Sequence, residues 1–329
     1  MRIKFSLVLL VAFLLGGSQS ADSESLDVEI SGYMQTWFVI DGGSDPETTF
    51  RTRRARMGFA ANPESNLITK LSLNVNPDNL GVSDAYFQWN PDIESQIKPF
   101  LRVGQFRKPF SRHWFRYPGS NPNMIDRAAA VGILSDWQVT TRDQGAMLGL
   151  NQLPLKGQAW LGVFNGAPQG SRQDTDSGKQ LVARLEHDVA KSLSVGGNVA
   201  ITGGESYPRS EAMVGFDAEL KINDLVVVGE VFGGEIKNAL PDSIPHRVQN
   251  FRSFFLEVVH KPQVGWHPGA RVERIDRDTS QDDEAFWLFT GQIGYAFHAN
   301  ARWQFNTVVS RSGEGESNAI FYNQFTVSF

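Results

Sequence analysis

Charged residues fall at every second position in many segments of the chain, the spacing that places side chains on one face of a β-strand. In the first half of the chain this face is mainly basic, and it carries Arg54, Arg56, Lys70, Arg102 and Arg184. In the second half it is mainly acidic, and it carries Asp217, Glu219, Glu230, Glu257 and Glu273. Two such sets facing each other across water would create a transverse field that orients dipolar solutes, which is the chemistry of a selective channel lining.

A second interpretation is that these charges pair with neighbours on adjacent strands and only solvate the surface. The exceptions to each pattern would supply the partners: Glu29, Asp84 and Glu186 in the basic half, Arg271 and Arg302 in the acidic half. Charge reversal at Arg54 and Arg56 separates the two interpretations, because only a channel lining would change its ion selectivity.

Arg51 and Arg53 lie, by strict alternation, on the opposite face from Arg54 and Arg56. They would then point outward, where a guanidinium can bind the phosphates of lipopolysaccharide in a bidentate manner. The alternative is a β-bulge that turns them inward. The sequence leaves both open.

The longest segment without strand alternation runs over residues 107–142. Its polar residues include Arg112, His113, Arg116 and Arg127, and its apolar stretch "AAAVGIL" with Trp137 requires burial. Long segments of this kind are usually functional. We expect this one to fold into the lumen of a barrel as a constriction loop, with an outward cap or a contact to a neighbouring subunit as the alternative.

Alternation recurs from end to end and predicts an all-β protein of sixteen strands of roughly ten residues. The predicted strands are 26–40, 50–61, 68–75, 83–89, 98–107, 143–151, 157–165, 179–188, 192–203, 212–222, 225–235, 251–260, 266–275, 285–297, 301–309 and 319–329. A different division of residues 204–250 would give eighteen. Short turns and long polar connectors alternate along the chain, except near residues 76–79, and this arrangement is typical of short periplasmic turns and long extracellular loops.

A soluble β-sandwich would bury both inner faces, and the charged face could not be buried unpaired. A transmembrane antiparallel up-and-down barrel removes the conflict, because its apolar face meets lipid and its charged face meets water. Aromatic residues flank the predicted strand ends, as in the girdles of such barrels. They are Trp89, Trp266, Tyr295, Phe297 and Trp303 at short turns and Trp37, Phe38 and Trp287 at long loops.

Residues 1–21 read as a cleaved signal peptide, with Arg2 and Lys4 before an apolar run too short to span a bilayer; a retained N-terminal anchor is the alternative. We expect residues 22–329 to form the barrel. The signal peptide contains two of the 31 basic and none of the 36 acidic residues, so the remaining chain has a net charge of −7, which argues against nucleic-acid binding. The chain has no cysteine, which excludes disulfides and thiolate chemistry.

No Gly-x-Ser-x-Gly or His-Glu-x-x-His pattern is present, and the six histidines lack metal-ligand spacing. We therefore expect no enzyme activity, no metal and no cofactor. A barrel that hydrolyses lipids or peptides remains an alternative function, and a plugged structural or adhesion barrel is another. Sixteen strands favour an open aqueous channel over a filled lumen.

The chain ends in an amphipathic strand whose final residue is Phe329. Phe321, Phe325, Val327 and Phe329 would face lipid, and the intervening polar residues would face the lumen. A terminal phenylalanine on such a strand resembles the signal read by the outer-membrane assembly machinery.

Several segments together resemble the phosphate-selective porin O and P family. They are "FRTRRARMGFAANP" (50–63), "LRVGQFRKPFS" (101–111), "RDQGAMLGL" (142–150), "LGVFNGAPQG" (161–170), "ARVERID" (270–276) and "FTVSF" (325–329). Having about sixteen strands and no lysine run that maps onto a phosphate ladder, the chain resembles a divergent, small member. The resemblance implies a porin in the outer membrane of a Gram-negative bacterium, assembled as a trimer of barrels.

Taken together, the sequence predicts passive diffusion of small hydrophilic solutes or ions, with anions such as phosphate among the candidates. The expected partners are outer-membrane lipid and lipopolysaccharide, the solutes, the assembly machinery and two further copies of the chain.

Overall fold

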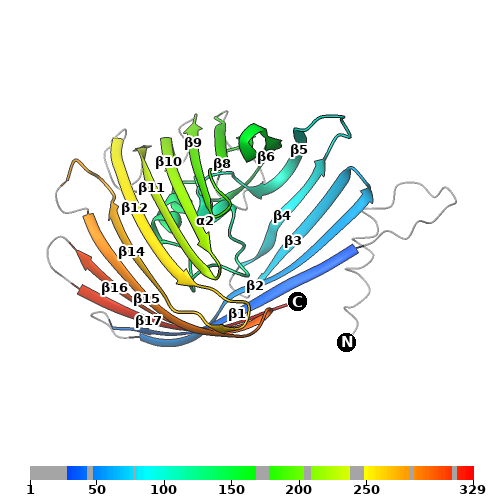
Figure 1. Ribbon diagram of the computed structural model, residues 1–329. Helices are drawn as coiled ribbons and strands as arrows, with labels where there is room; N and C mark the ends of the chain where they lie inside the picture. Colours follow the sequence, from blue (N-terminus) through cyan, green and yellow to red (C-terminus); the bar gives the residue numbers. More distant parts are fainter. Residues whose placement is uncertain are drawn as a thin grey trace.

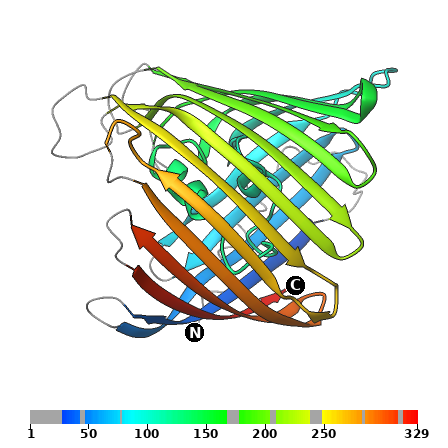
Figure 2. The same ribbon diagram turned by 60° about the vertical axis from the view of Figure 1, so that its left-hand side comes forward.

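The chain folds into a closed antiparallel β-barrel with an ordered segment inside it (Figures 1 and 2). This computed structural model describes residues 28–42, 47–76, 79–167, 178–203, 209–237, 248–281, 285–312 and 317–329. The predicted signal peptide lies outside the described residues.

The described strands and helices follow one another in a simple order. The strands of the first half are β1 (Val28–Asp41), β2 (Glu47–Glu64), β3 (Leu67–Asn76), β4 (Asn79–Trp89), β5 (Lys98–Arg107), β6 (Arg142–Leu153), β7 (Gly157–Phe164) and β8 (Gln180–Asp188). Those of the second half are β9 (Leu193–Thr202), β10 (Arg209–Ile222), β11 (Leu225–Lys237), β12 (Val248–His260), β13 (Gly265–Trp266), β14 (Gly269–Asp276), β15 (Ala285–His298), β16 (Ala301–Ser312) and β17 (Ser317–Ser328). Two short helices, α2 (Arg112–Phe115) and α3 (Ala129–Asp136), lie between β5 and β6, and a 3-10 turn, η1 (Pro154–Lys156), joins β6 to β7.

Each long strand pairs with the next one along the chain, and β1 pairs with both β2 and β17, which closes the barrel. The two-residue strand β13 pairs with β15, and β12 pairs directly with β14. The described residues thus form sixteen long strands and one short extra one. All sixteen predicted ranges overlap a long strand, so the predicted antiparallel barrel is confirmed.

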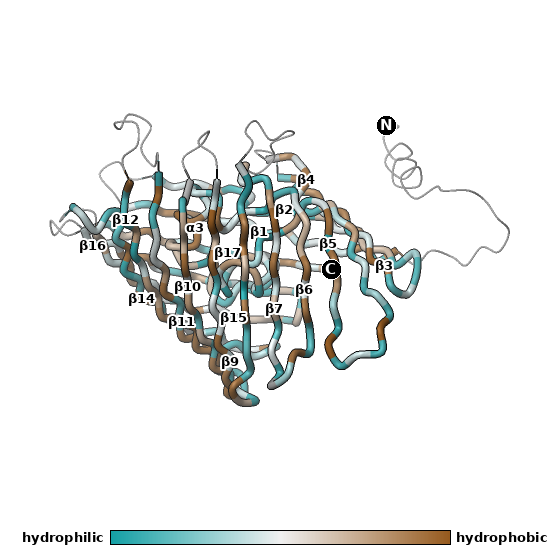
Figure 3. Tube along the Cα trace, turned by 90° about the horizontal axis from the view of Figure 1, so that it is seen from above, coloured by the Kyte–Doolittle hydropathy of each residue, from teal (hydrophilic) through white to brown (hydrophobic). Residues whose placement is uncertain are grey.

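The strands alternate between an outer apolar face and an inner polar face. In β12 the side chains of Phe254, Leu256 and Val258 are exposed, whereas Phe255 and Glu257 between them are buried inside. Seen from above, hydrophobic and hydrophilic residues follow one another along the strands (Figure 3). An exposed apolar outer surface on a closed sheet is the arrangement that lipid requires.

The C-terminal residue fastens the closing pair of strands. The backbone N–H of Phe329 donates to the carbonyl of Gly32 at 2.9 Å, and the N–H of Gly32 donates back to the carbonyl of Phe329 at 2.9 Å. A Cβ at Gly32 would lie 2.4 Å from the Phe329 ring, so glycine allows the terminal aromatic to approach β1 closely. Phe325, Val327 and Phe329 are exposed on the outer face, as the alternation predicts.

A β-bulge interrupts the pairing of β1 with β2. Arg54 lies opposite Gln35, but the next pair is Thr52 with Thr36, so Arg53 is the extra residue and Arg51 lies opposite Trp37. Directly opposed residues share a face. Trp37 is buried inside the barrel against Ile125, so Arg51 also faces inward, and its guanidinium lies 5.0 Å from the Trp37 ring. Of the two positions that the sequence leaves open for Arg51 and Arg53, the structure shows the one in which a bulge turns them inward. The placement of Trp37 in an outer girdle is wrong.

α3 is the longer helix of the segment between β5 and β6, and α2 is a single turn capped by the Ser111 hydroxyl, which accepts from the N–H of Trp114. No helix within the described ranges has the length and apolar character needed to cross a membrane.

Candidate functional site

Residues 108–141, here called the inner segment, leave β5 at the barrel wall, cross the lumen and return to β6. Figure 2 shows their coils enclosed by the strands. The inner segment contacts inward-facing side chains of β1, β2, β7, β8, β10, β11, β12, β14, β15 and β16. It therefore crosses the lumen and is held by strands around most of the wall.

Glu230 on β11 binds the start of α2. Its carboxylate accepts hydrogen bonds from the Ser111 hydroxyl at 3.2 Å and from the backbone N–H groups of Arg112 and His113 at 3.0 and 2.7 Å. The Glu230 side chain is buried, and these donors compensate for the water that it has lost.

Arg112 extends from α2 to the carboxylates on β10. Its Nε lies 2.7 Å from Asp217, and its Nη1 lies 3.4 Å from Glu219. Arg184 on β8 shares Asp217 at 2.7 Å and also binds Glu186 at 2.7 Å. The Tyr117 hydroxyl donates to Glu219, and burial together with that carboxylate raises the pKa of Tyr117.

A second buried network fixes the part of the inner segment that precedes α3. His113 Nε2 and Glu257 are 3.2 Å apart, and Arg271 bridges Glu257 at 3.0 Å and Glu273 at 2.7 Å. Glu273 also accepts from the backbone N–H of Ala129 at the start of α3, at 2.6 Å.

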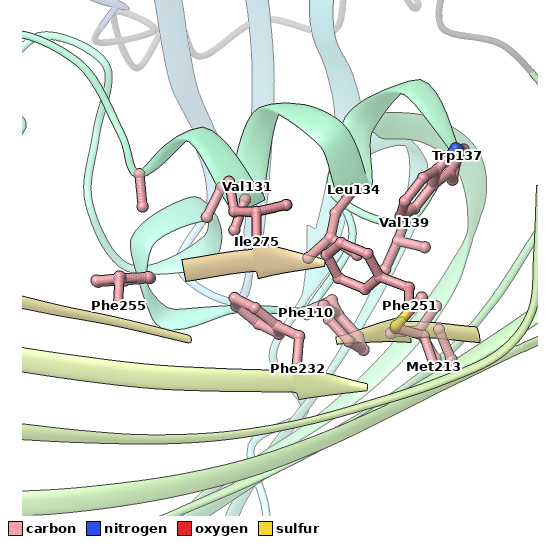
Figure 4. Packing of buried hydrophobic residues seen from close by; sticks show 14 of the residues in the cluster. Phe110, Val131, Leu134, Trp137, Val139, Met213, Phe232, Phe251, Phe255 and Ile275 are labelled. Atoms are coloured by element: carbon pink, nitrogen blue, oxygen red, sulfur yellow. The ribbon is translucent and has the colours of Figure 1, made fainter. Parts of the chain in front are cut away.

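The inner face of the same strands is apolar beyond these carboxylates, and α3 packs there. Val131, Leu134, Trp137 and Val139 lie against Phe232, Phe251, Met213 and Ile275 (Figure 4). The Trp137 and Phe251 rings meet edge to face with centroids 4.8 Å apart. This wall of the barrel is therefore complementary to the inner segment in two ways. Its acidic residues contact the basic residues of the segment, and its aromatic residues contact the apolar helix α3.

The acidic residues face the inside of the barrel as predicted, but the expectation that they border open water needs correction. Glu230, Glu257 and Glu273 are 1% exposed, and Asp217 and Glu219 are also buried. Arg112 and His113 of the inner segment cover them and are themselves 3% exposed. Arg184, predicted for the basic wall, also belongs to this buried network because it lies beside Asp217.

Arg54 and Arg53 hold the inner segment from the other side. They bind the two carboxylate oxygens of Asp126 at 2.6 and 2.7 Å. Burial alone would raise the pKa of Asp126, but the charges of Arg54 and Arg53 outweigh it and hold this pKa well below its usual range. Arg116 reaches the opposite part of the wall, where it pairs with Glu186 at 2.6 Å.

Three predicted residues of the basic wall remain without an acidic partner. Within the described residues, Arg56, Lys70 and Arg102 form no ion pair. Arg102 instead donates to the Gln88 amide oxygen at 2.6 and 3.0 Å, and its guanidinium lies 4.4 Å from the Tyr86 ring. The Nε of Arg56 is buried without a hydrogen-bond partner. These side chains lie on the inner face of β2, β3 and β5 and are half-buried.

The structure adds residues to this wall that alternation does not identify. Arg107, Arg127 and Arg142 surround Trp114, with guanidinium carbons 5.2, 5.1 and 5.4 Å from its ring. Arg107 and Arg127 donate to backbone carbonyls, and Arg142 pairs with Asp84 at 2.9 Å. Burial and the charges of Arg54 and Arg142 lower the pKa of Arg127 to about 9. A position where cations repel one another in this way is favourable for an anion.

The two sides of the lumen therefore differ in net charge. On the acidic side the inner segment covers the carboxylates, and Arg112 of this segment together with Arg184 and Arg271 of the wall pairs with them. The basic side keeps an excess of positive charge over its described carboxylates, Asp84 and Asp126. No group of three or more His, Asp or Glu residues in the described part of the chain could hold a metal ion.

No protein-family model matches the sequence, and no curated protein matches it. Solved structures do. The chain is similar to an anion-selective porin from Comamonas acidovorans, with a TM-score of 0.68 at 11% identity over 93% of this chain and 100% of that one. The fold is that of an outer-membrane porin.

Two further solved structures of outer-membrane proteins are similar to this one. The outer-membrane channel DcaP of Acinetobacter baumannii has a TM-score of 0.66 at 13% identity, over 95% of this chain and 100% of that one. The in-vitro folded OmpT of Vibrio cholerae, in a trimer form, has a TM-score of 0.62 at 12% identity, over 93% and 100%.

Proposed function

We propose that this protein is an outer-membrane porin whose water-filled channel passes small hydrophilic solutes and prefers anions. The observation that carries the proposal is the asymmetry of the lumen. The carboxylates of the acidic wall are covered and are paired or hydrogen-bonded, whereas Arg56, Lys70 and Arg102 remain without an ion pair on the side of the Arg107, Arg127 and Arg142 cluster. Uncompensated cations along a narrow aqueous path raise the local anion concentration and repel cations.

In this proposal the inner segment forms the constriction. It confines the path to the side of β2 to β6, where Arg127 and Trp114 of the inner segment face the basic wall. Inorganic phosphate is one anion that such arginines bind well, because a guanidinium can donate two parallel hydrogen bonds to it.

Reversal potential across a salt gradient in a planar bilayer tests the proposal. We expect the wild-type channel to favour chloride over potassium. The combined variant Arg56→Gln, Lys70→Gln and Arg102→Gln should lose most of that preference. The matched control is Lys98→Gln, Lys156→Gln and Lys191→Gln, which removes the same charge from exposed positions near the short turns and should keep it. Cation preference in the wild type, or unchanged selectivity in the lumen variant, would refute the proposal.

We also propose a homotrimer, supported by the trimer form of the similar OmpT structure and by the sequence resemblance. Light scattering of the detergent-folded protein would show three copies, and a monodisperse monomer would contradict it. Phe329 is proposed as the signal for the assembly machinery, since it is exposed at the end of the closing strand.

A further inference from the structure

Three arginines lie on the outer face of the barrel at its long-loop end. They are Arg252 on β12, Arg274 on β14 and Arg311 on β16, and all three are exposed. In the strand register Arg274 lies opposite Trp287, and Trp287 lies opposite Arg311, so these side chains form a row. Within the described residues none of the three arginines forms an ion pair.

Two hollows adjoin the row. The larger has a volume of about 630 Å³ and is lined by Arg252 and Arg274 above the exposed apolar side chains of Val214, Phe216 and Phe254. Asp276 is the carboxylate in its lining. The smaller hollow, of about 560 Å³, is lined by Trp287, Phe289, Arg311 and Ser312. Each hollow combines guanidinium groups at the loop end with hydrophobic side chains nearer the middle of the barrel.

Such a surface fits one kind of partner in a membrane. An unpaired arginine on a lipid-facing strand is unfavourable unless it lies at headgroup level and meets an anion. The apolar side chains below it fit acyl chains, and Trp287 is an aromatic of the headgroup region. In the outer leaflet of an outer membrane, the lipid with both phosphates and several acyl chains is lipopolysaccharide.

We propose that Arg252, Arg274 and Arg311 form a binding site for the phosphorylated lipid A part of lipopolysaccharide. The guanidinium groups bind the phosphates, and the two hollows take acyl chains. Arg51 and Arg53, for which the sequence left a lipopolysaccharide contact open, face the lumen and are not part of this site. It rests on the long loops being extracellular and is independent of what the channel conducts.

Native mass spectrometry of the detergent-folded protein tests the site, with bisphosphorylated lipid A as the probe. We expect the wild type to retain lipid A, and the variant Arg252→Gln, Arg274→Gln and Arg311→Gln to bind it at least tenfold more weakly. The control variant Lys98→Gln, Lys156→Gln and Lys191→Gln should bind as the wild type does. Single-channel conductance of the arginine variant should equal that of the wild type, which shows that the barrel is folded and separates this test from that of the channel.

Three other probes identify the ligand. Dephosphorylated lipid A should bind the wild type as weakly as lipid A binds the arginine variant. Equal binding of phosphatidylglycerol would overturn the proposal in favour of a general anionic-lipid surface. Displacement of lipid A by inorganic phosphate at comparable concentration would overturn it in favour of a free-phosphate site.

Discussion

Replacing Arg271 with glutamine should release the inner segment from the barrel wall. The Arg271 guanidinium binds Glu257 and Glu273 at 3.0 and 2.7 Å, and it donates to the carbonyls of Asp126 and Arg127 at 3.0 and 3.2 Å. Both glutamates are 1% exposed, so Arg271→Gln leaves two negative charges buried without their cation. Removing one partner of a buried ion pair costs about 3–5 kcal/mol. The ratio of docked to released segment should therefore fall roughly a hundredfold to several thousandfold.

Limited trypsin digestion and single-channel recording measure the release. Arg112, Arg116 and Arg127 become cleavable when the inner segment leaves the wall, and the channel becomes wider and noisier. The combined variant Arg271→Gln, Glu257→Gln and Glu273→Gln keeps the shape of the network without its charges, and it should recover most of the trypsin resistance. If Arg271→Gln alone stays resistant and quiet, the inner segment does not depend on this network.

Four further predictions concern other parts of the structure. Burial and the charge of Arg302 lower the pKa of Lys261 to about 7, so Lys261 loses its positive charge near the inner segment as pH rises. Anion selectivity should therefore decline between about pH 6 and about pH 8. The variant Lys261→Met should not show this decline. In the unfolded chain Lys261 keeps its proton up to the ordinary pKa of 10.5, so Lys261 makes the free energy of unfolding rise with pH between about 7 and 10.5. Thermal stability that does not change across this pH window would contradict the lowered pKa of Lys261. Gly32→Ala should destabilise the β1–β17 closure by about 1–3 kcal/mol, because the added Cβ would lie 2.9 Å from the backbone carbonyl oxygen of Arg56 as well as 2.4 Å from the Phe329 ring. The measurement is a lower unfolding temperature in detergent, and Gly32→Ala with Phe329→Ala should recover only the part that is due to the ring. Trp137→Ala should weaken docking of α3 by about 3–5 kcal/mol, with faster trypsin cleavage as the readout; cleavage at the wild-type rate would mean that the Phe251 contact contributes little.

The strands were predictable from sequence because lipid on one side and polar groups on the other impose a strict two-residue period. The boundaries of β5, for example, were predicted to the residue. The two-residue period no longer predicts the face of a side chain where a bulge or a break interrupts the strand. Arg53 adds one residue to β2, and simple counting then assigns Arg51 to the wrong face. The break at residues 267 and 268 likewise divides one predicted strand into β13 and β14.

The basic side of the candidate site was only partly predictable. Arg56, Lys70 and Arg102 are strand residues, and parity alone places them inside. Arg107 and Arg142 stand at the two ends of the inner segment, where alternation begins or ends, so their convergence on Trp114 has no periodic signal. Their symmetric position at the boundaries of the longest non-strand segment is the one feature that could have identified them.

The carboxylates show a different limit. Alternation reports which face a side chain is on, but it does not report what lies against that face. Glu230 and Glu257 were placed inside correctly, yet their partners come from residues more than a hundred positions earlier in the chain. One feature of the sequence does indicate this contact. The inner segment is rich in Arg and His and has an apolar stretch, and the inner faces of the later strands carry the complementary acidic and aromatic residues.

The bulge in β2 also has a consequence for how this strand tolerates changes of length. Deleting a residue from a barrel strand normally exchanges its inner and outer faces from that point onward, which no single substitution can repair. Arg53 is the exception in the β1–β2 pair, because it already has no residue opposite it. Its deletion would leave a regular ladder with Arg51 and Trp37 still inside and Phe50 still outside. Deletion of Arg53 should therefore be tolerated, whereas deletion of a residue that is paired in the β1–β2 ladder should abolish insertion of the barrel.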